Sequence, residues 1–264
     1  MFQARLEYSL RPVSIFQFPI SPYRDQQKSS SGEKKLMAHK WGMVVDLDRC
    51  TGCEACVVAC RAENNIPTIG EAQASIGRAI HWIRVERYWE GEFPDVRVKF
   101  QPVLCQQCDA APCETVCPTY ASYHNPEGLN AQVYNRCVGT RYCGNACPYT
   151  VRFFNWFNPA WDKPLNLQLN PDVSIREVGV MEKCTFCVQR IKAAEIRVEA
   201  EKRELKDGEF NPACVQSCAP KALVFGDLND PASEVSRLAR SNRGTKLLEE
   251  LGTRPKVTYL QRDS

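Results

Sequence analysis

The pattern of cysteines limits what this chain can fold into more than any other feature. All 15 cysteines of the 264 residues fall into four short runs. Two of these runs are copies of one another, because residues 49–60 and 136–147 align without a gap at an offset of 87 residues. One cysteine of the first copy has no counterpart in the second: Thr140 stands where the first copy has Cys53. The fold must therefore bring many thiols together, and one copy of the repeat contributes one thiol fewer.

The spacing within the runs predicts iron–sulfur clusters. Such clusters are held by cysteine thiolates in the pattern C-x2-C-x2-C-x3-C followed by proline, because several side chains must reach one small core. The first run has this spacing in Cys50, Cys53, Cys56 and Cys60. The third run lacks one member and contains Cys137, Cys143 and Cys147. The second run and the split fourth run contain Cys105, Cys108, Cys113 and Cys117, and Cys184, Cys187, Cys214 and Cys218.

Two other uses of cysteine fit this sequence poorly. Disulfide scaffolds are typical of short secreted chains, whereas this chain is long and has an odd number of cysteines. Structural zinc sites use paired C-x2-C motifs with longer spacers and often include histidine. Here four cysteines crowd into residues 50–60, and the chain has three histidines. Of these, His81 is expected to face solvent or a partner rather than bind a metal.

The fold class that the runs predict is α+β, with two interleaved double-cluster ferredoxin-like units, β-hairpin insertions and a C-terminal extension. In two-cluster ferredoxins the fourth cysteine of each run binds the other cluster, so four runs make two units and four sites. Spacing alone does not say which runs pair. Local patterns predict strands at 43–47, 81–89, 96–100, 222–228 and 257–260, a second hairpin within 120–134, and helices from Ala55 and at 191–205, 233–241 and 245–251.

Other parts of the sequence are less decisive. Residues 1–36 are rich in proline, serine and charge, and are interpreted either as a disordered tail or as a segment upstream of a true start at Met37. The aromatic residues within 151–157 are interpreted either as core packing beside a cluster or as a docking surface for a membrane partner. No apolar run approaches the roughly 18 residues of a membrane span, and no export signal is evident. No phosphate loop, dinucleotide fingerprint or metallohydrolase motif is present, so we expect no substrate site.

Several longer phrases resemble a known family. Three phrases and the split fourth run resemble the four-cluster iron–sulfur subunits of membrane-bound molybdopterin-type oxidoreductases. The phrases are RCVGTRYCGNACPYTVRFFN, GVMEKCTFCVQRI and PACVQSCAPKALVFGDLNDP. Three further features are most similar to the subunits of two quinone-linked complexes. They are the segment HWIRVERYWEG, the threonine in RCVGTRYC, and the segment EELGTRPKVTYL. The two complexes are the menaquinone reductase complex (Qrc) of sulfate-reducing bacteria and alternative complex III. The resemblance covers roughly residues 41–260.

The resemblance implies how the runs pair. It implies three [4Fe-4S] clusters, held by Cys50, Cys53, Cys56 and Cys218, by Cys184, Cys187, Cys214 and Cys60, and by Cys105, Cys108, Cys113 and Cys147. It implies one [3Fe-4S] cluster on Cys117, Cys137 and Cys143 beside Thr140, because a threonine hydroxyl hardly loses its proton whereas a metal deprotonates a thiol. The implied domains are the segment 1–36, a unit of 37–100 plus 180–228, a unit of 101–179, and a docking extension at 229–264.

The resemblance also implies a function. We expect an electron-transfer subunit that passes electrons along four clusters between a haem-bearing or catalytic partner and a membrane subunit that reacts with menaquinone. The expected partners are a molybdopterin-oxidoreductase-like large subunit, an integral membrane quinone-binding subunit and a multihaem cytochrome c subunit. The expected location is the periplasmic face of the cytoplasmic membrane, reached through partners.

Alternatives to this function differ in partners and cofactors. One is the iron–sulfur subunit of a molybdenum reductase for polysulfide, tetrathionate or a similar oxyanion. Another is a soluble polyferredoxin, which the extension at 229–264 argues against. A nucleic-acid partner is not expected: the formal charge of +3 counts cysteine as neutral, and four clusters of about −2 each with their thiolates would bring the loaded chain to about −5.

Overall fold

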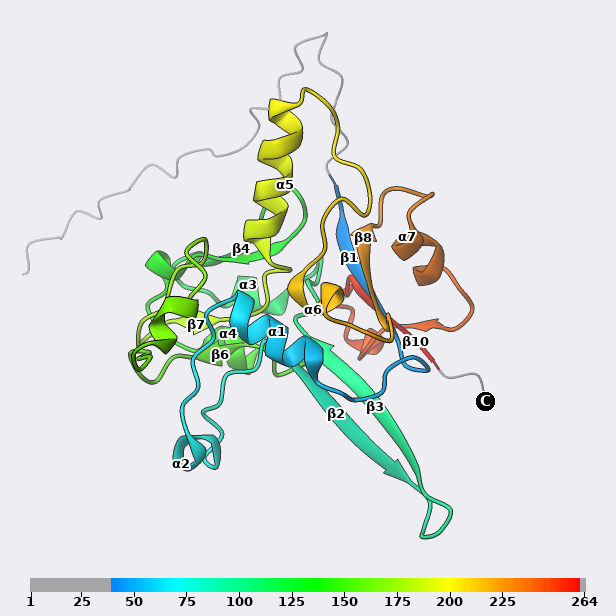
Figure 1. Ribbon diagram of the computed structural model, residues 1–264, viewed down its shortest axis with the longest axis horizontal. Coiled ribbons are helices and arrows are strands. Elements are labelled where there is room, and N and C mark those ends of the chain that lie inside the picture. Colours follow the sequence, from blue (N-terminus) through cyan, green and yellow to red (C-terminus); the bar gives the residue numbers. More distant parts are fainter. Residues whose placement is uncertain (1–38, 262–264) are drawn as a thin grey trace, which may run out of the picture. The chain divides into compact units, whose positions relative to one another are not determined.

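The computed structural model of the chain describes residues 39–261 (Figure 1). Both interpretations of residues 1–36 lie outside this range. The described part is mixed α+β, as predicted, with short elements joined by loops that carry most of the cysteines. The predicted division into two interleaved units remains a prediction.

A four-stranded sheet joins the two ends of the described chain. Its order is β8-β1-β10-β9, and β1 runs antiparallel to β8 but parallel to β10. In Figure 1, the blue β1 and the red β10 lie side by side. Its strands are β1 (Trp41–Asp46), β8 (Leu223–Asp227), β9 (Gly244–Thr245) and β10 (Val257–Leu260). Of these, β1, β8 and β10 confirm the strands predicted at 43–47, 222–228 and 257–260.

The alternation of side chains along β1 gives this sheet two buried faces. Val44 points to one face, where it packs with Val235 of helix α7 (Glu234–Ala239). Met43 and Val45 belong to the main core, which also contains Cys56 and other cysteines. Because successive strand residues point to opposite faces, a single apolar strand anchors both the C-terminal helix and the cysteine-rich core.

Three antiparallel hairpin-like pairs surround the cysteine loops. The long one joins β2 (Ile83–Glu90) to β3 (Arg97–Leu104), and it is buried at its base and exposed towards its tip. A second joins β4 (Ser122–His124) to β5 (Asn130–Gln132). The sequence predicted both. It did not predict the third pair, β6 (Phe153–Phe154) with β7 (Met181–Glu182), because two-residue strands carry no periodic signal.

The helices are short except for two, and several begin directly beside a cysteine. None within residues 39–261 is long and apolar enough to span a bilayer. The α-helices not yet named are α1 (Ala55–Glu63), α2 (Glu71–Ala74), α3 (Pro112–Thr115), α4 (Tyr142–Asn145), α5 (Val188–Ala200) and α6 (Ala213–Gln216). The 3-10 turns are η1 (Tyr134–Arg136), η2 (Leu165–Gln168) and η3 (Glu249–Leu251).

Two predicted helices differ from the structure. The one predicted at 191–205 is α5, which begins at Val188 and ends at Ala200, where Lys202 takes a positive φ of 54°. The helix predicted at 245–251 is wrong. Gly244 and Thr245 instead pair with β10, and Leu248 has a φ of 48°, which an α-helix does not accommodate. Pairing with a distant strand overrides the local helical pattern there.

Candidate iron–sulfur sites

The cysteines gather into four groups, here named sites A to D. Site A is a cavity lined by Cys50, Cys53, Cys56 and Cys218. The loop before α1 supplies Cys50 and Cys53, and it turns through Gly52 and Glu54, whose φ angles are 69° and 60°. Cys56 is buried in the first turn of α1, whereas Cys53 is exposed. The turn therefore presents thiols to one cavity from a loop and a helix at once.

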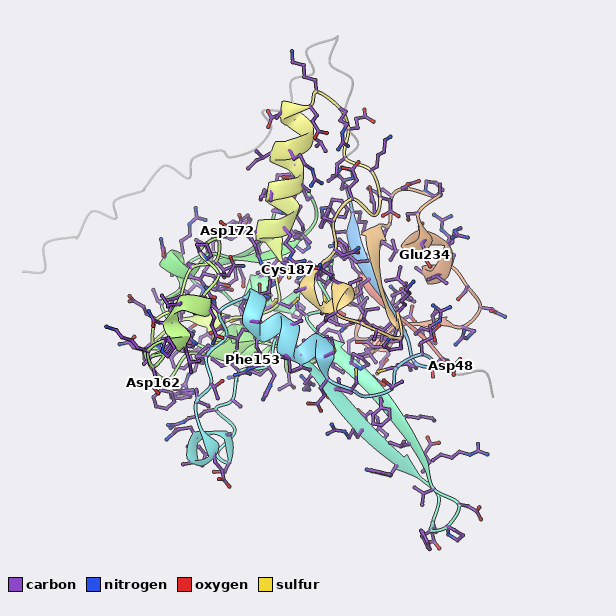
Figure 2. All side chains as sticks on the ribbon, in the orientation of Figure 1. Asp48, Phe153, Asp162, Asp172, Cys187 and Glu234 are labelled. Atoms are coloured by element: carbon purple, nitrogen blue, oxygen red, sulfur yellow. The ribbon has the colours of Figure 1, made fainter. Side chains whose placement is uncertain are left out.

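Site B lies deepest. Cys60, Cys184, Cys187 and Cys214 are all buried, and their thiols are close enough to act on one another electrostatically. Figure 2 shows Cys187 in the interior, at the start of α5. The side chain of Asn64 donates to Cys60 Sγ at 3.6 Å and to Cys187 Sγ at 3.8 Å. This amide links thiols from α1 and from the fourth run.

Site C is a second cavity, lined by Cys105, Cys108, Cys113 and Cys147. Cys113 lies in α3, and Cys147 follows α4. Arg152 lines the same cavity.

Site D contains Cys117, Cys137 and Cys143, whose thiols also interact electrostatically. The backbone N–H of Met181 donates to Cys137 Sγ at 3.3 Å. Burial opposes the thiolate of Cys117, but nearby backbone N–H groups lower its pKa overall. Thr140 is exposed, three residues after Cys137 and three before Cys143. The structure thus brings three cysteines together beside the loop that carries the substituted position.

The four sites follow one another in space. The thiol of Cys214 in site B is influenced by Cys56 in site A, and that of Cys184 in site B by Cys105 in site C. Cys113 of site C and Cys143 of site D pack in one small core. The order is therefore A, B, C, D, with the exposed Cys53 and Thr140 at the two ends.

Three cysteines share one backbone motif. After Cys117, Cys147 and Cys218, the residue three positions on takes a φ of 53° or 54°. The N–H of the next residue then points back to sulfur, and Ala121 and Ala222 donate to Cys117 and Cys218 at 3.2 Å each. Hydrogen bonds from N–H to cluster-binding sulfur favour the thiolate. A proline one or two residues after the cysteine, at Pro118, Pro148 and Pro220, is the local sequence signal of this motif.

The chemistry of the groups fits clusters with a positively charged core. Burial raises the pKa of Cys56 and Cys184 to about 12 and that of Cys113 to about 11, and neighbouring thiols add to each rise. Free thiolates are therefore disfavoured in these cavities. A bound metal core replaces the protons and supplies the missing positive charge.

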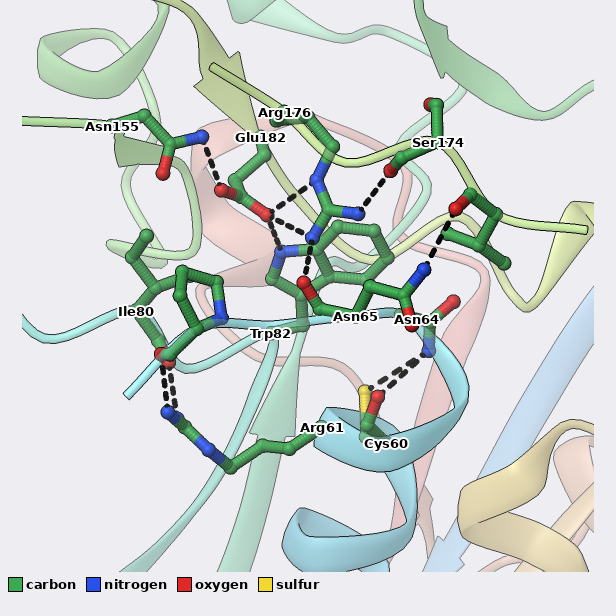
Figure 3. A network of polar contacts seen from close by, with 12 residues as sticks. Cys60, Arg61, Asn64, Asn65, Ile80, Trp82, Asn155, Ser174, Arg176 and Glu182 are labelled. Atoms are coloured by element: carbon green, nitrogen blue, oxygen red, sulfur yellow. Dashed lines mark hydrogen bonds and ion pairs between the residues drawn. The ribbon is translucent and has the colours of Figure 1, made fainter. Parts of the chain in front are cut away.

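A buried ion pair supports the strand next to site B (Figure 3). Arg176 and Glu182 are joined at 2.7 Å and their side chains are almost wholly buried. The indole N–H of Trp82 donates to the same carboxylate at 3.0 Å, and Asn155 donates to its other oxygen. The pair is thus neutral overall and fully hydrogen bonded, which makes its burial tolerable.

Sequence reasoning did not single out two buried cations beside the cysteines. Lys183 is fully buried and donates to the carbonyl of Cys184 at 2.9 Å, and Arg152 lies between sites C and D. Both follow or precede a cysteine closely in sequence, which is the only local signal. Among 34 lysines and arginines, such proximity does not distinguish buried charges from exposed ones.

The aromatic residues within 151–157 divide into two groups. Phe153 and Phe154 pack against the cores that contain the cysteines. Trp156 and Phe157 are each 37% exposed, and Arg78 lies over Trp156 at 4.6 Å. The packing interpretation applies to the first group, and a docking role for the second remains a prediction.

Comparison with known proteins agrees with this picture. Residues 96–165 match the family described as a 4Fe-4S dicluster domain, and residues 41–62 match a 4Fe-4S binding domain. The chain is 45% identical to the menaquinone reductase iron–sulfur cluster-binding subunit of Nitratidesulfovibrio vulgaris, over 84% of this chain and 89% of that protein. It is 38% identical to the Hdr-like menaquinol oxidoreductase iron–sulfur subunit 1 of Archaeoglobus fulgidus, over 87% and 86%.

A third relative comes from a different kind of complex. The arsenate respiratory reductase iron–sulfur subunit of a Shewanella species is 36% identical, over 83% of this chain and 95% of that protein. Identity above one third along nearly the whole length covers all four cysteine runs. The chain therefore belongs to the family of iron–sulfur subunits of menaquinone reductase and molybdopterin-oxidoreductase complexes, and it binds 4Fe-4S clusters through its cysteines.

Proposed function

We propose that this chain is the electron-conducting subunit of a menaquinone-linked respiratory complex, with [4Fe-4S] clusters at sites A, B and C and a [3Fe-4S] cluster at site D. Bound clusters of this kind accept and release single electrons. The chain's own role is to hold them in order, exclude water from the middle of the series and leave access at its ends.

The observation that supports this proposal most is the linear order of the four sites. All four cysteines of site B are buried, whereas site A at one end has an exposed cysteine and site D at the other adjoins the exposed Thr140. A fully buried site B within the series and accessible cysteine loops at its ends suit passage of electrons between two partners.

Iron analysis and spectroscopy test the cluster assignment. The proposal predicts about 15 iron atoms per chain in an intact preparation. It also predicts the electron paramagnetic resonance signal of an oxidised three-iron cluster in the protein as isolated under air. An iron content of about eight, or substantial zinc, would contradict four clusters.

The proposed partners follow from the same reasoning. Site D would face an integral membrane subunit that binds menaquinone, and site A would face a molybdopterin-oxidoreductase-like subunit or a multihaem cytochrome c, on the periplasmic side of the membrane. Copurification from membranes, with mass-spectrometric identification of the accompanying chains, tests these assignments. We expect the isolated chain not to reduce menaquinone; reduction by the chain alone at the rate of the complex would contradict the need for a membrane partner.

A second candidate is the iron–sulfur subunit of a molybdenum-containing oxyanion reductase. The similarity to the arsenate respiratory reductase subunit favours it. The two candidates differ in the large partner rather than in this chain. A molybdenum cofactor in the copurified complex would favour the reductase, whereas c-type haem without molybdenum would favour the menaquinone reductase.

A further inference from the structure

Arg152 occupies the space between sites C and D. It lines the cavity of site C. Its guanidinium lies within hydrogen-bonding reach of Cys113 in site C and of Cys143 in site D. Arg152 directly precedes β6, and the motif after Cys147 turns the chain so that it re-enters the core at this point. One side chain thus lies beside the thiols of two neighbouring sites.

The other contacts of Arg152 are with neutral groups. Nη1 donates to Gln132 Oε1 and Nη2 donates to Asn130 Oδ1, both at 2.8 Å. Arg152 is 7% exposed, and within residues 39–261 no carboxylate forms an ion pair with it. The nearest acid in this network is Glu114, which accepts from the amide of Asn130 and pairs with His124. The two neutral acceptors hold the guanidinium in place without cancelling its charge.

A second buried arginine shows what is unusual here. Arg176 is even more deeply buried, but its charge is cancelled by Glu182 at 2.7 Å. A buried charge is strongly unfavourable unless a counter-charge is close. Since arginine stays protonated in proteins, the counter-charge of Arg152 must come from the thiolates and the clusters they hold at sites C and D.

We propose that Arg152 tunes the clusters of sites C and D together, its fixed positive charge raising the reduction potential of both. Reduction adds one electron to a cluster that already carries negative charge with its thiolates, so a nearby cation stabilises the reduced form more than the oxidised form. A low effective dielectric strengthens the effect relative to an exposed cation. Sites A and B lie further along the series and should feel it less. This inference rests on the proposed cluster assignment.

The test compares variants of the intact complex by redox titration followed by electron paramagnetic resonance. Arg152→Gln removes the charge and keeps a hydrogen-bond donor. We expect the equilibrium constant for reduction of the clusters at sites C and D to fall at least tenfold. For a one-electron couple this lowers the reduction potential by about 59 mV, and the potentials of sites A and B should be unchanged. Arg152→Lys keeps the charge and should stay close to the wild-type potentials.

Arg141→Gln is the matched control. Arg141 follows Thr140 in the loop of site D but is exposed, so the same substitution should shift the potential of site D far less. Equal shifts in the two glutamine variants, or unchanged potentials in Arg152→Gln with full iron content, would overturn the proposal. If Arg152→Gln loses iron, Arg152→Lys decides: wild-type potentials support the proposal, and lowered potentials overturn it. A wild-type iron content of about eight would instead contradict the cluster assignment, whatever Arg152 does.

Discussion

The loops of runs one and three show how the same backbone can serve two different sites. Gly52 and Gly139 have φ angles of 69° and 72°, and Glu54 and Arg141 have φ angles of 60° and 63°. In both copies the helix begins one residue later, at α1 and at α4. The repeat in the sequence is therefore a repeat in conformation as well.

The two copies differ at the residue between these left-handed positions. Cys53 and Thr140 are both exposed, each between a glycine and the residue that caps the helix. The replacement therefore changes one possible ligand without changing the loop around it. The two copies therefore predict that the cluster type at each end of the series depends on a single side chain, which substitution can exchange.

The largest effect is expected from making run three resemble run one. Thr140→Cys places a fourth thiol at site D, and because the loop already has the conformation of run one, no rearrangement is needed. We expect the iron content to rise from about 15 to about 16 atoms per chain and the three-iron resonance to disappear. Thr140→Ser is the control and should change neither. A persistent three-iron signal in Thr140→Cys would show that Thr140 does not occupy the vacant corner of the site.

The reverse exchange should have a smaller effect on the complex. Cys53→Thr removes one thiol from site A, and we expect a second three-iron signal and the loss of about one iron atom. Cys53 is exposed, so the protein should lose little packing. Cys56→Thr is the comparison, because Cys56 is buried and its loss should lower cluster content further. Site A keeping all its iron in Cys53→Thr would mean that another group replaces the thiol.

The outcome of the sequence predictions depends on how local each signal is. The hairpin of β2 and β3 was predicted because its alternation lies within the strands themselves. The parallel pairing of β1 with β10 was not, since it joins residues more than 200 positions apart. Pairing outside the local window also explains the error at 245–251, where Thr245 pairs with Tyr259 of β10, 14 positions further along the chain. In both cases the pairing of strands that are separated in the sequence determined the secondary structure, which the local pattern of residues could not predict.

The candidate site shows the same limit. Each run was recognised from spacing, because cysteines one helical turn or one loop apart must meet. The order of the sites needed the tertiary structure: Cys184 and Cys105, which join sites B and C, are 79 residues apart. The sequence also did not indicate that Arg152 lies between sites C and D, because the residues that fix its guanidinium there, Asn130 and Gln132 of β5, are 20 or more positions away in the chain.

The lengths of α1 and α4 provide a further prediction. Arg61 continues α1, and its side chain donates to the carbonyls of Ile80 and Pro67 at 2.7 and 2.6 Å. The matching residue after α4 is Pro148, which disfavours helical conformation at Cys147. Arg61→Pro should destabilise the protein by about 3 kcal/mol beyond Arg61→Ala.

Thermal unfolding of the loaded chain measures this difference. An extra 3 kcal/mol corresponds to a fall in Tm of about 6–12 °C for a chain of this size. Pro148→Ala is the matched control, and it should change Tm little because α4 has already ended at Asn145. Equal Tm values for Arg61→Pro and Arg61→Ala would mean that α1 can end before residue 61, as α4 does.

The smallest effect is expected at the two left-handed residues that precede the helices. Glycine at Glu54 or Arg141 should relieve about 1–2 kcal/mol of backbone strain and cost about 0.5–1 kcal/mol in chain entropy. Glu54→Gly also loses the exposed ion pair with Arg87, and Arg141→Gly loses the stacking of Arg141 over Phe154 at 5.4 Å and Trp156 at 5.0 Å, each loss worth up to about 1 kcal/mol. These terms nearly cancel, so Glu54→Gly and Arg141→Gly should each change Tm by less than about 3 °C.

Glu54→Ala and Arg141→Ala keep the strain but lose the contact, and should therefore be less stable than the glycine variants. Because both copies have the same backbone, the two pairs of variants should behave alike; a marked loss of stability at only one copy would show that the loops are not equivalent.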